Sequence, residues 1–383
     1  MRACPQSWRN AIGAVTLLGL IACGPGGSSP APAPNAAVAA SSTPAASPAA
    51  DLAQGLIDAA RAEGQLTLGW AESVLGGSQM VPRLADGVNK LYGLNLSVQY
   101  TPSPNMVEMG SKLAQEYQAN RPSTTDVYIG PGRAIVSLMQ VGALEPVDWA
   151  AWATNVRDPK LVAPGGMAVE VAWLQPGITY NTSKLTGDAV PTSLEDLLKP
   201  QYAGRIASTP YAAFFDSLAS PEIWGERRTL DYVTQLAGQL AGLMGCGEST
   251  RLVSGEFDLL ALDCGSFDAR LAQAKGAPVA QTIPSDAALI FPWYLGVPRN
   301  AAHPAAAKLF VNYLLGRDGQ DVMYETHFTD HPLVAGSKVA PEIARIRGSG
   351  AQLYALDVAF RQRNDEQELD RINAEIIRII QRR

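Results

Sequence analysis

A regular alternation of strand-length apolar runs with segments of helical period restricts most strongly what this chain can fold into. Gln65 to Trp70 (QLTLGW) has the composition of a strand, and apolar residues then recur at helical spacing from Val81 to Leu91, before Gly93. The alternation continues from Asp51 onward and is typical of an α/β protein with a largely parallel sheet. With 383 residues, 47% of them hydrophobic, the chain is long enough for two domains and too apolar to be disordered.

The same patterns predict further elements along this region. Strands are expected at Leu94 to Tyr100, Asp126 to Ile129, Val169 to Trp173, Ile178 to Asn181 and Phe257 to Leu262. Helices are expected at Met106 to Tyr117, Arg133 to Val141, Tyr232 to Leu240, Pro304 to Leu315 and Asp365 to Arg382. Thr192 to Glu195 (TSLE) has the spacing of a capping box before a further helical turn.

The charge balance argues against one class of partner. Lys and Arg total 30 while Asp and Glu total 36, so the net charge is −6 and the chain lacks the basic field that binding to nucleic-acid phosphates requires. Beyond the N-terminus there is no apolar run of roughly 18 residues, the length needed to cross a bilayer. We therefore expect no nucleic-acid partner and no membrane-spanning body.

The first 22 residues have the pattern of an export signal. Arg2 and Arg9 form a short positive segment, Ala11 to Ile21 is apolar, and Leu20-Ile21-Ala22-Cys23 follows. This local pattern resembles the lipobox of bacterial lipoproteins, whose Cys is lipidated and becomes the first residue after cleavage. We expect residues 1–22 to be a lipoprotein signal peptide and Cys23 the lipidation site; an ordinary secretory peptide with a chance Cys is the alternative. The net charge becomes −8 once Arg2 and Arg9 are removed.

Residues 23–50 are then expected to form a tether. From Gly24 to Ala50 nearly every residue is Gly, Pro, Ala or Ser, a composition that cannot bury enough apolar surface to fold. Alternating Ala and Pro makes such a segment semi-extended, at roughly 3 Å per residue. The expected location is the cell envelope outside the cytoplasmic membrane, with the folded body held at the membrane by its lipid.

Two of the four cysteines are candidates for a disulfide. Cys4 lies in the predicted signal peptide and Cys23 is the predicted lipidation site, which leaves Cys246 and Cys264 in an oxidising compartment. We predict a disulfide between these two residues. Two buried free thiols are the alternative, because the sequence gives no distance.

Six stretches of sequence carry a family resemblance. The most specific is Asn300 to Gln320, which begins Asn-Ala-x-His-Pro-x-Ala-Ala-x-x-Phe and ends on Gly-Gln. The others are Gly64 to Leu68, Asp126 to Pro146, Ile178 to Thr182, Pro191 to Ile206 and Gly255 to Asp258. In these stretches, which span nearly all of residues 64–325, the chain resembles extracellular solute-binding proteins of ABC importers. The specific resemblance is to the ferric-iron-type branch of the two-lobed (type II) periplasmic binding proteins.

The resemblance implies two α/β lobes, each a mainly parallel sheet flanked by helices, that close on a ligand like other periplasmic binding proteins. Two crossover hinges would join them, near Val169 to Tyr180 and near Leu289 to Pro298. Lobe 1 is expected to comprise residues 51–171 and 297–345, and lobe 2 residues 172–296 and 346–383.

Three loops are candidate ligand contacts, because in open α/β sheets ligands bind beyond the carboxyl ends of strands, near helix N-termini. They are residues 71–78 with Glu72 and Ser73, residues 130–133 with Arg133, and residues 208–211 with Thr209 and Tyr211. Arg133 is the best single candidate, since a guanidinium at a helix start is a bidentate donor for a carboxylate or phosphate. A solvated or salt-bridged surface arginine is the alternative.

Aromatic side chains near the expected cleft support a second hypothesis about the ligand. Their faces stack on rings and attract organic cations. With Glu72, Asp216 or Asp268 nearby, they would suit a cationic or zwitterionic organic ligand, although Trp293 and Tyr294 have hinge packing as their alternative role. The aromatic candidates are Trp70, Tyr211, Phe267, Trp293 and Tyr294.

The resemblance is incomplete at one position that matters for cargo. Ferric-binding members carry two adjacent tyrosines after the strand that follows the Gly-Glu segment. The corresponding stretch here is Asp263 to Asp268 (DCGSFD), and no Tyr-Tyr pair occurs in the sequence. Phe267 has no oxygen to offer, so transport of ferric iron through this site is not expected, and Ser266 and Phe267 are kept as candidate contacts for another ligand.

Neither a metal site nor a catalytic site is predicted. His327 and His331 are four residues apart, but Thr329, Asp330 and Pro332 make a poor helix and no HExxH pattern is present. No cofactor is expected. A hydrolase of the cell envelope is the rival function and would need a nucleophile with a base or a paired acid and base, yet no GxSxG pattern occurs.

The preferred function is a monomeric, membrane-tethered receptor that binds a small solute between its lobes and delivers it to the transmembrane subunits of an ABC permease. The cargo expected first is an organic zwitterion or anion, followed by an aromatic cation or polyamine, a sugar, and then ferric iron. A binding protein that feeds a sensor shares every sequence feature and stays open as a further alternative.

Overall fold

The computed structural model describes residues 48–265 and 267–382, which belong to one compact unit. The predicted signal peptide, the lipidation site Cys23 and the tether up to residue 47 lie outside the described residues, as does Ser266. Helix α1 (Pro48–Glu63) includes the last three positions of the expected tether. In the part of the chain that the structure describes, no helix is both long and apolar enough to cross a membrane.

Two sheets form the centre of the first half of the fold. Strands β1 (Gln65–Ala71) and β2 (Ser97–Ser103) pair in parallel. Strand β10 (Ala288–Gly296) pairs antiparallel with β3 (Tyr128–Pro131) and β4 (Val169–Leu174), and parallel with β11 (Leu353–Ala355). Alternate residues of β1, such as Leu66 and Leu68, are fully buried.

Helices cover these sheets and build one large hydrophobic cluster, which we call the first cluster. α9 is almost entirely buried in it, because its sequence (PAAAKLFVNYL) is apolar on most sides. The other helices of the first cluster bury one face each. Besides α1, these helices include α2 (Val81–Tyr92), α3 (Met106–Gln118), α4 (Gly132–Gln140), α9 (Pro304–Leu314) and α10 (Arg317–His327).

A five-stranded sheet forms the centre of the second half, and its core is the second cluster. The strand order is β7 (Leu240–Leu243), β6 (Ile206–Ser208), β8 (Leu259–Leu260), β5 (Ile178–Asn181) and β9 (Val279–Thr282). Around it lie α5 (Phe215–Leu218), α6 (Glu226–Ala237), α7 (Ser249–Val253) and α8 (Phe267–Ala274). The C-terminal part adds α11 (Ala340–Gly348), α12 (Val358–Arg363) and α13 (Glu366–Gln381).

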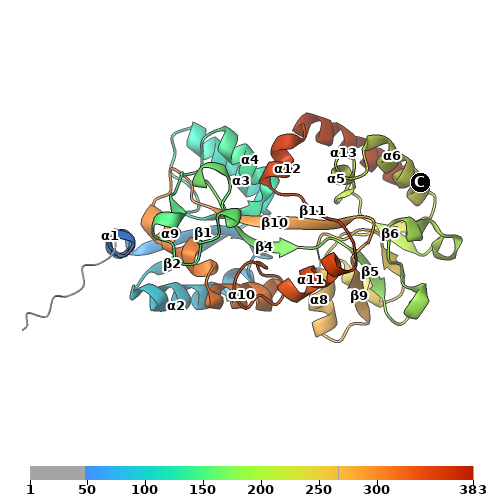
Figure 1. Cartoon of the computed structure of the whole chain (residues 1–383), viewed down its shortest axis with the longest axis horizontal. Coiled ribbons are helices and arrows are strands. Elements are labelled where there is room, and N and C mark those ends of the chain that lie inside the picture. The colour runs from blue at the N-terminus through green and yellow to red at the C-terminus, as the bar shows by residue number, and fades with distance from the viewer. Residues whose placement is uncertain (1–47, 266, 383) are drawn as a thin grey trace, which may run out of the picture. The chain divides into compact units, whose positions relative to one another are not determined.

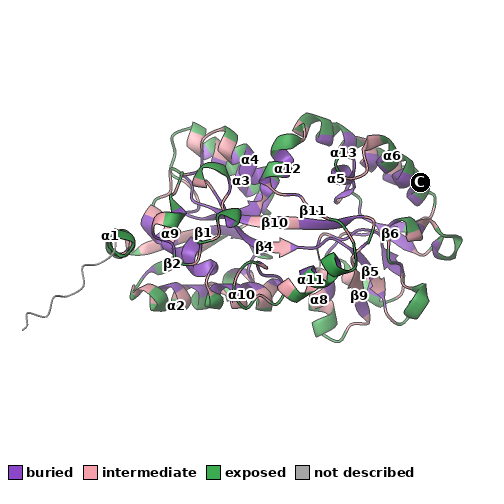
Figure 2. Cartoon of the chain, in the orientation of Figure 1, coloured by how far each residue is buried: buried purple, intermediate pink, exposed green. Residues whose placement is uncertain are grey.

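The last helix, α13, shows how the sequence determines an element of the second cluster. Asp365 caps its start by accepting bonds from the backbone N–H groups of Gln367 and Glu368. Four apolar residues then recur at helical spacing and are buried against the second cluster: Leu369, Ile372, Ile376 and Ile380. Figure 2 shows the corresponding division, with exposed residues on the outer faces of the helices and buried residues on the strands.

Strand β10 links the two clusters. Leu289 is buried in the second cluster, whereas Tyr294 and Leu295 are buried in the first. Tyr294 donates a hydrogen bond to Glu170 of β4 at 2.9 Å and accepts one from the N–H of Val358 at 3.1 Å, so β10, β4 and α12 are tied together. Figure 1 shows α4 and α12 lying on the same side of β10.

The expected α/β class is confirmed, with differences in detail. The strand pairings divide evenly between parallel and antiparallel among the described residues, because β5 and β10 run antiparallel to most of their neighbours. The strand predicted at Phe257 to Leu262 is only Leu259–Leu260. Leu240, predicted at the end of a helix, begins β7, because α6 ends before Gly238.

Candidate ligand-binding cleft

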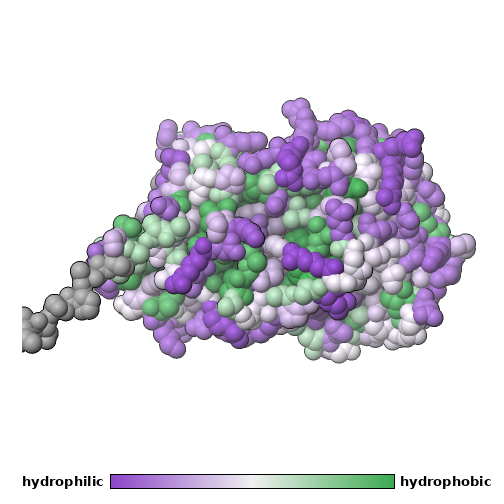
Figure 3. Space-filling view, viewed as in Figure 1, coloured by the Kyte–Doolittle hydropathy of each residue, from purple (hydrophilic) through white to green (hydrophobic). Residues whose placement is uncertain are grey.

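A cavity of about 830 Å³ lies between helices of the first cluster and residues of the second cluster. Its volume falls within the range typical of small-molecule sites. Helices α3 and α4 contribute one wall, and the segment that leads into α5, together with Cys264, Phe291, Arg361 and Asn373, contributes the other. We call this cavity the cleft. On the face of the molecule in Figure 3, hydrophobic residues gather toward the middle, with a few hydrophilic residues among them, and the margin is mostly hydrophilic.

The wall from α3 and α4 combines apolar side chains with the neutral polar side chains of Ser111, Gln115, Ser137 and Gln140. Val107 is 57% exposed there, although it is a large hydrophobic residue, and Ala114 lies about two helical turns further along α3. Gly110 allows the two helices to approach closely, since a Cβ at this position would lie 3.2 Å from the Cβ of Ala134. This wall therefore provides apolar surface and neutral hydrogen-bonding groups, and Arg133 at the edge is the one charged residue among its described lining residues.

Arg133 is engaged across the cleft. Its Nε lies 3.3 Å from Glu366 Oε2, and its Nη2 forms an ion pair with Asp370. Because α4 belongs to the first cluster and α13 to the second, these ion pairs join the two. Arg133 is therefore a salt-bridged arginine in this structure. The expectation that its guanidinium is free to bind a ligand is corrected.

The opposite wall contains a buried carboxylate. Asp216, in α5, accepts a bond from Ser217 N–H at 2.8 Å and a long one from Asn373 Nδ2 at 3.4 Å. Burial raises the pKa of Asp216 above its ordinary value, and the nearby charge of Arg361 opposes this rise. Arg361 also lines the cleft and is only 7% exposed. Sequence reasoning named Asp216 but gave no signal for Arg361 or Asn373, which lie far from Asp216 along the chain.

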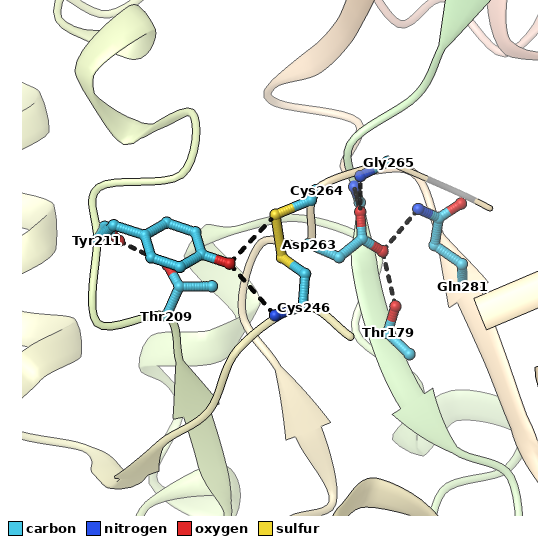
Figure 4. Close-up of a disulfide and its surroundings, with 9 residues drawn as sticks. Thr179, Thr209, Tyr211, Cys246, Asp263, Cys264, Gly265 and Gln281 are labelled. Atoms are coloured by element: carbon cyan, nitrogen blue, oxygen red, sulfur yellow. Dashed lines mark hydrogen bonds between the residues drawn. A yellow bond between two sulfur atoms is a disulfide. The ribbon is translucent and has the colours of Figure 1, made fainter. Parts of the chain in front are cut away.

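The predicted disulfide between Cys246 and Cys264 is confirmed, and it lies at the cleft (Figure 4). The hydroxyl of Tyr211 accepts a bond from Cys246 N–H at 3.2 Å and lies 3.5 Å from Cys264 Sγ. Thr209 donates to the carbonyl oxygen of Tyr211 at 2.5 Å, so hydrogen bonds fix both the backbone and the side chain of Tyr211. The phenol oxygen is thus occupied by the disulfide loop, while the ring, 39% exposed, faces the cleft.

A second buried carboxylate fixes the loop that carries Cys264. Asp263 accepts bonds from the N–H groups of Gly177 and Gly265 at 3.0 Å each, from Thr179 at 2.6 Å and from Gln281 at 2.7 Å (Figure 4). Burial raises its pKa, and these four bonds oppose the rise. Asp263 therefore attaches the disulfide loop to the start of β5, next to the expected first crossover.

The structure separates other predicted contacts from the cleft. Trp70 is corrected to a core residue: it is 1% exposed, and its Nε1 donates to Val127 O at 2.7 Å. Tyr294 is likewise buried, in the network with Glu170 described above. Glu72 accepts bonds from Ser78 within its own loop, which leaves this carboxylate with a local structural role.

Three further candidates gather around His327 and not around the cleft. His327 Nε2 lies 2.5 Å from Ser73 O, and its ring centroid lies 5.6 Å from that of Phe267 and 6.2 Å from that of Trp293. Burial lowers the pKa of His327, and the contact with Ser73 opposes this change. Among residues 48–265 and 267–382, no group of three or more His, Cys, Asp or Glu side chains is placed to hold a metal ion.

This chain belongs to the family of bacterial extracellular solute-binding proteins, which matches residues 124–351. A curated relative, the Fe(3+)-binding periplasmic protein of Serratia marcescens, is 23% identical over 281 residues, which cover 70% of this chain and 80% of the relative. The resemblance to the ferric-type branch of the two-lobed binding proteins is thereby confirmed.

Solved structures show the same fold. The substrate-binding protein of an ABC transporter from Agrobacterium tumefaciens is 18% identical, with a TM-score of 0.66, covering 84% of this chain and 96% of that one. Iron-bound HitA from Pseudomonas aeruginosa is also 18% identical, with a TM-score of 0.64, covering 82% of this chain and 99% of that one.

Proposed function

We propose that this protein is a substrate-binding protein that captures a small solute in the cleft and delivers it unchanged to an ABC permease. The observation that carries the proposal is the cavity of about 830 Å³ with one wall from each hydrophobic cluster, in a chain of a solute-binding family. A site built from two bodies that meet at a hinge closes when a ligand bridges them. The protein acts as a binding protein and not as an enzyme.

The cargo is a small organic zwitterion or anion rather than free ferric iron. A hard cation needs several oxygen ligands at one point. Asp216 is the one acidic side chain among the described residues that line the cleft, and the hydroxyl of Tyr211 accepts from Cys246 N–H, so the several oxygens that a hard cation needs do not meet at one point there. The larger part of the surface is apolar, from Val107 and Ala114 to Phe214, which suits a molecule with a carbon body.

The protein works outside the cytoplasmic membrane as a monomer, held there by a lipid on Cys23 and a tether through residue 50, with lobes bounded as expected from the resemblance. The proposal of a lipid anchor rests on the Leu-Ile-Ala-Cys sequence and on the Pro- and Ala-rich composition that follows it.

A melting-temperature screen tests the proposed function. The purified protein is heated with ferric citrate, amino acids, phosphonates, sugar phosphates, thiamine, polyamines and oligosaccharides in turn. A ligand at about a hundred times its Kd adds roughly 2.7 kcal/mol of stability, which is easily measured. We expect one organic class to raise the melting temperature and to be recovered chemically unchanged. Turnover of the ligand would favour the hydrolase, and a response to ferric citrate alone would overturn the proposed cargo.

A further inference from the structure

The guanidinium of Arg361 is buried at the cleft with most of its hydrogen-bonding capacity unused. Its Nη2 donates to Ser217 Oγ at 3.4 Å, and its Nε is buried without an acceptor among the described residues. A guanidinium carries five N–H donors. A buried charged donor without a partner costs free energy, which an anion bound beside it would recover.

Asp216, on the same wall, is a buried carboxylate without a cation in contact. Among the described ion pairs none joins Asp216 to Arg361 or to Arg133, although both cations are close enough to influence it. Its bonds come from neutral donors, the N–H and hydroxyl of Ser217 and Asn373 Nδ2. The Ser217 hydroxyl, which accepts the long bond from Arg361, lies between the two charges, so the wall offers one positive and one negative group that are not in direct contact.

Apolar surfaces surround this pair of charges. Phe214 and Phe291 line the cleft and pack edge to face, with ring centroids 4.9 Å apart. Val107 and Ala114 face them from α3. An aromatic or aliphatic group in this space would be stabilised by the apolar surface that it buries.

We propose that the cargo is a zwitterion with an apolar body, whose anionic group binds Arg361 and whose cationic group binds Asp216. The apolar body lies between the Phe214–Phe291 pair and α3. This inference rests on the proposed function and names the class of its substrate. A simple anion would satisfy Arg361 but would face the carboxylate of Asp216, and a simple cation would meet the opposite problem.

A series of three probes of equal shape tests the proposal without any change to the protein. L-Phenylalanine carries both charges, 3-phenylpropionate lacks the ammonium group, and phenethylamine lacks the carboxylate. Each is titrated calorimetrically into the purified protein near neutral pH, alongside leucine and tyrosine as further zwitterions. We expect the zwitterions to bind, and each singly charged analogue to bind at least tenfold more weakly than phenylalanine.

Charge-neutral variants assign the two roles. Arg361→Gln and Asp216→Asn are each expected to weaken binding of the zwitterion at least tenfold. Arg157→Gln and Asp188→Asn change exposed residues outside the cleft and are the matched controls, which should bind as the unchanged protein does.

The outcomes separate this inference from the proposed function. Equal binding of phenylalanine and either singly charged analogue overturns the inference. If no zwitterion binds but another solute of the melting-temperature screen does, the inference fails and the proposed function stands. If no solute of either set binds, both fail.

Discussion

Arg133 of α4 forms an ion pair with Asp370 of α13, and this contact joins the first hydrophobic cluster to the second at the edge of the cleft. A second contact, to Glu366 at 3.3 Å, involves the same guanidinium. The guanidinium of Arg133, which the sequence analysis predicted to bind a ligand, therefore helps to hold the two clusters in their present arrangement. Because Arg133 is 44% exposed, each contact contributes at most about 1 kcal/mol, and salt weakens it further.

Arg133→Gln is expected to shift the protein toward a more open arrangement. The ion pairs favour the present arrangement by an amount comparable to thermal energy, so their loss changes the populations several-fold while stability changes by less than about 1 kcal/mol. Small-angle X-ray scattering without ligand should give a larger radius of gyration for the variant. Arg228→Gln is the matched control, because it breaks an exposed ion pair with Glu195 on the surface of the second half. Equal radii for both variants would contradict the role given to Arg133.

Removal of the disulfide should weaken both the fold and the binding site. Cys246 and Cys264 are 18 positions apart, and in the chain-entropy model closure of such a loop stabilises by about 3 kcal/mol. Replacing both with Ala is expected to lower the free energy of unfolding by that amount, as measured by urea denaturation, and to lower ligand affinity because Tyr211 loses its fixed position.

Tyr211→Phe separates these two effects. It keeps the ring and the disulfide but removes the bond to Cys246 N–H, at a cost of about 1 kcal/mol. If the disulfide acts on binding through Tyr211, this variant shows part of the affinity loss with the disulfide intact. Unchanged affinity in both variants would show that the loop has no part in binding.

Stability should fall as the pH rises from the unfolded pKa of Asp268, 3.8, to its folded pKa, about 7. Burial, followed by the charge of Asp263, raises the pKa of Asp268 to about 7, against 3.8 for the ordinary group. A carboxyl group whose pKa is raised on folding contributes its full stability below its unfolded pKa and loses it as the pH passes its folded pKa. Each pKa unit corresponds to about 1.4 kcal/mol.

Urea denaturation at about pH 5 and about pH 8 measures this effect. Asp268→Asn should be more stable than the unchanged protein at the higher pH and should show a smaller difference between the two conditions. Parallel profiles for the two proteins would mean that Asp268 stays ionised throughout.

Cys23→Ser should release the protein from the membrane fraction. Without a thiol at this position no lipid can be attached, and the tether has too little apolar surface to hold a membrane by itself. Cell fractionation with detection of the protein gives the result directly. Cys4→Ser is the control and should leave the protein at the membrane; a Cys23→Ser protein that also stays there would exclude the lipid anchor.

Long periodic elements were predictable from the sequence, because each carries its own signal. The helices at Val81–Tyr92, Pro304–Leu314 and Glu366–Gln381 agree closely with their expected ranges. Short elements such as α12 and β11 were not predicted, since six or three residues are too few to show a period.

The site was predictable only in part, because its residues meet through tertiary packing. Tyr211 comes from a loop that the parallel-sheet rule identifies, and Asp216 was named as an acid near the aromatic candidates. Arg361 is 144 positions from its partner Ser217, and Asn373 is 157 positions from its partner Asp216. No local sequence pattern indicates that either residue lies in this wall. Trp70 was misassigned because a residue at the end of a strand can point into the core as readily as into a cleft.

Blocking the cleft tests the central claim most directly. Ala114 lies on α3 and lines the cleft, so Ala114→Trp would fill part of its volume, whereas Ala59→Trp adds the same side chain at an exposed position of α1. The best solute from the melting-temperature screen is titrated calorimetrically into both variants and the unchanged protein. The account predicts one molecule bound per chain, with affinity lost at least tenfold in Ala114→Trp and kept in Ala59→Trp. Equal binding by both variants would show that the solute is held elsewhere and would contradict the account.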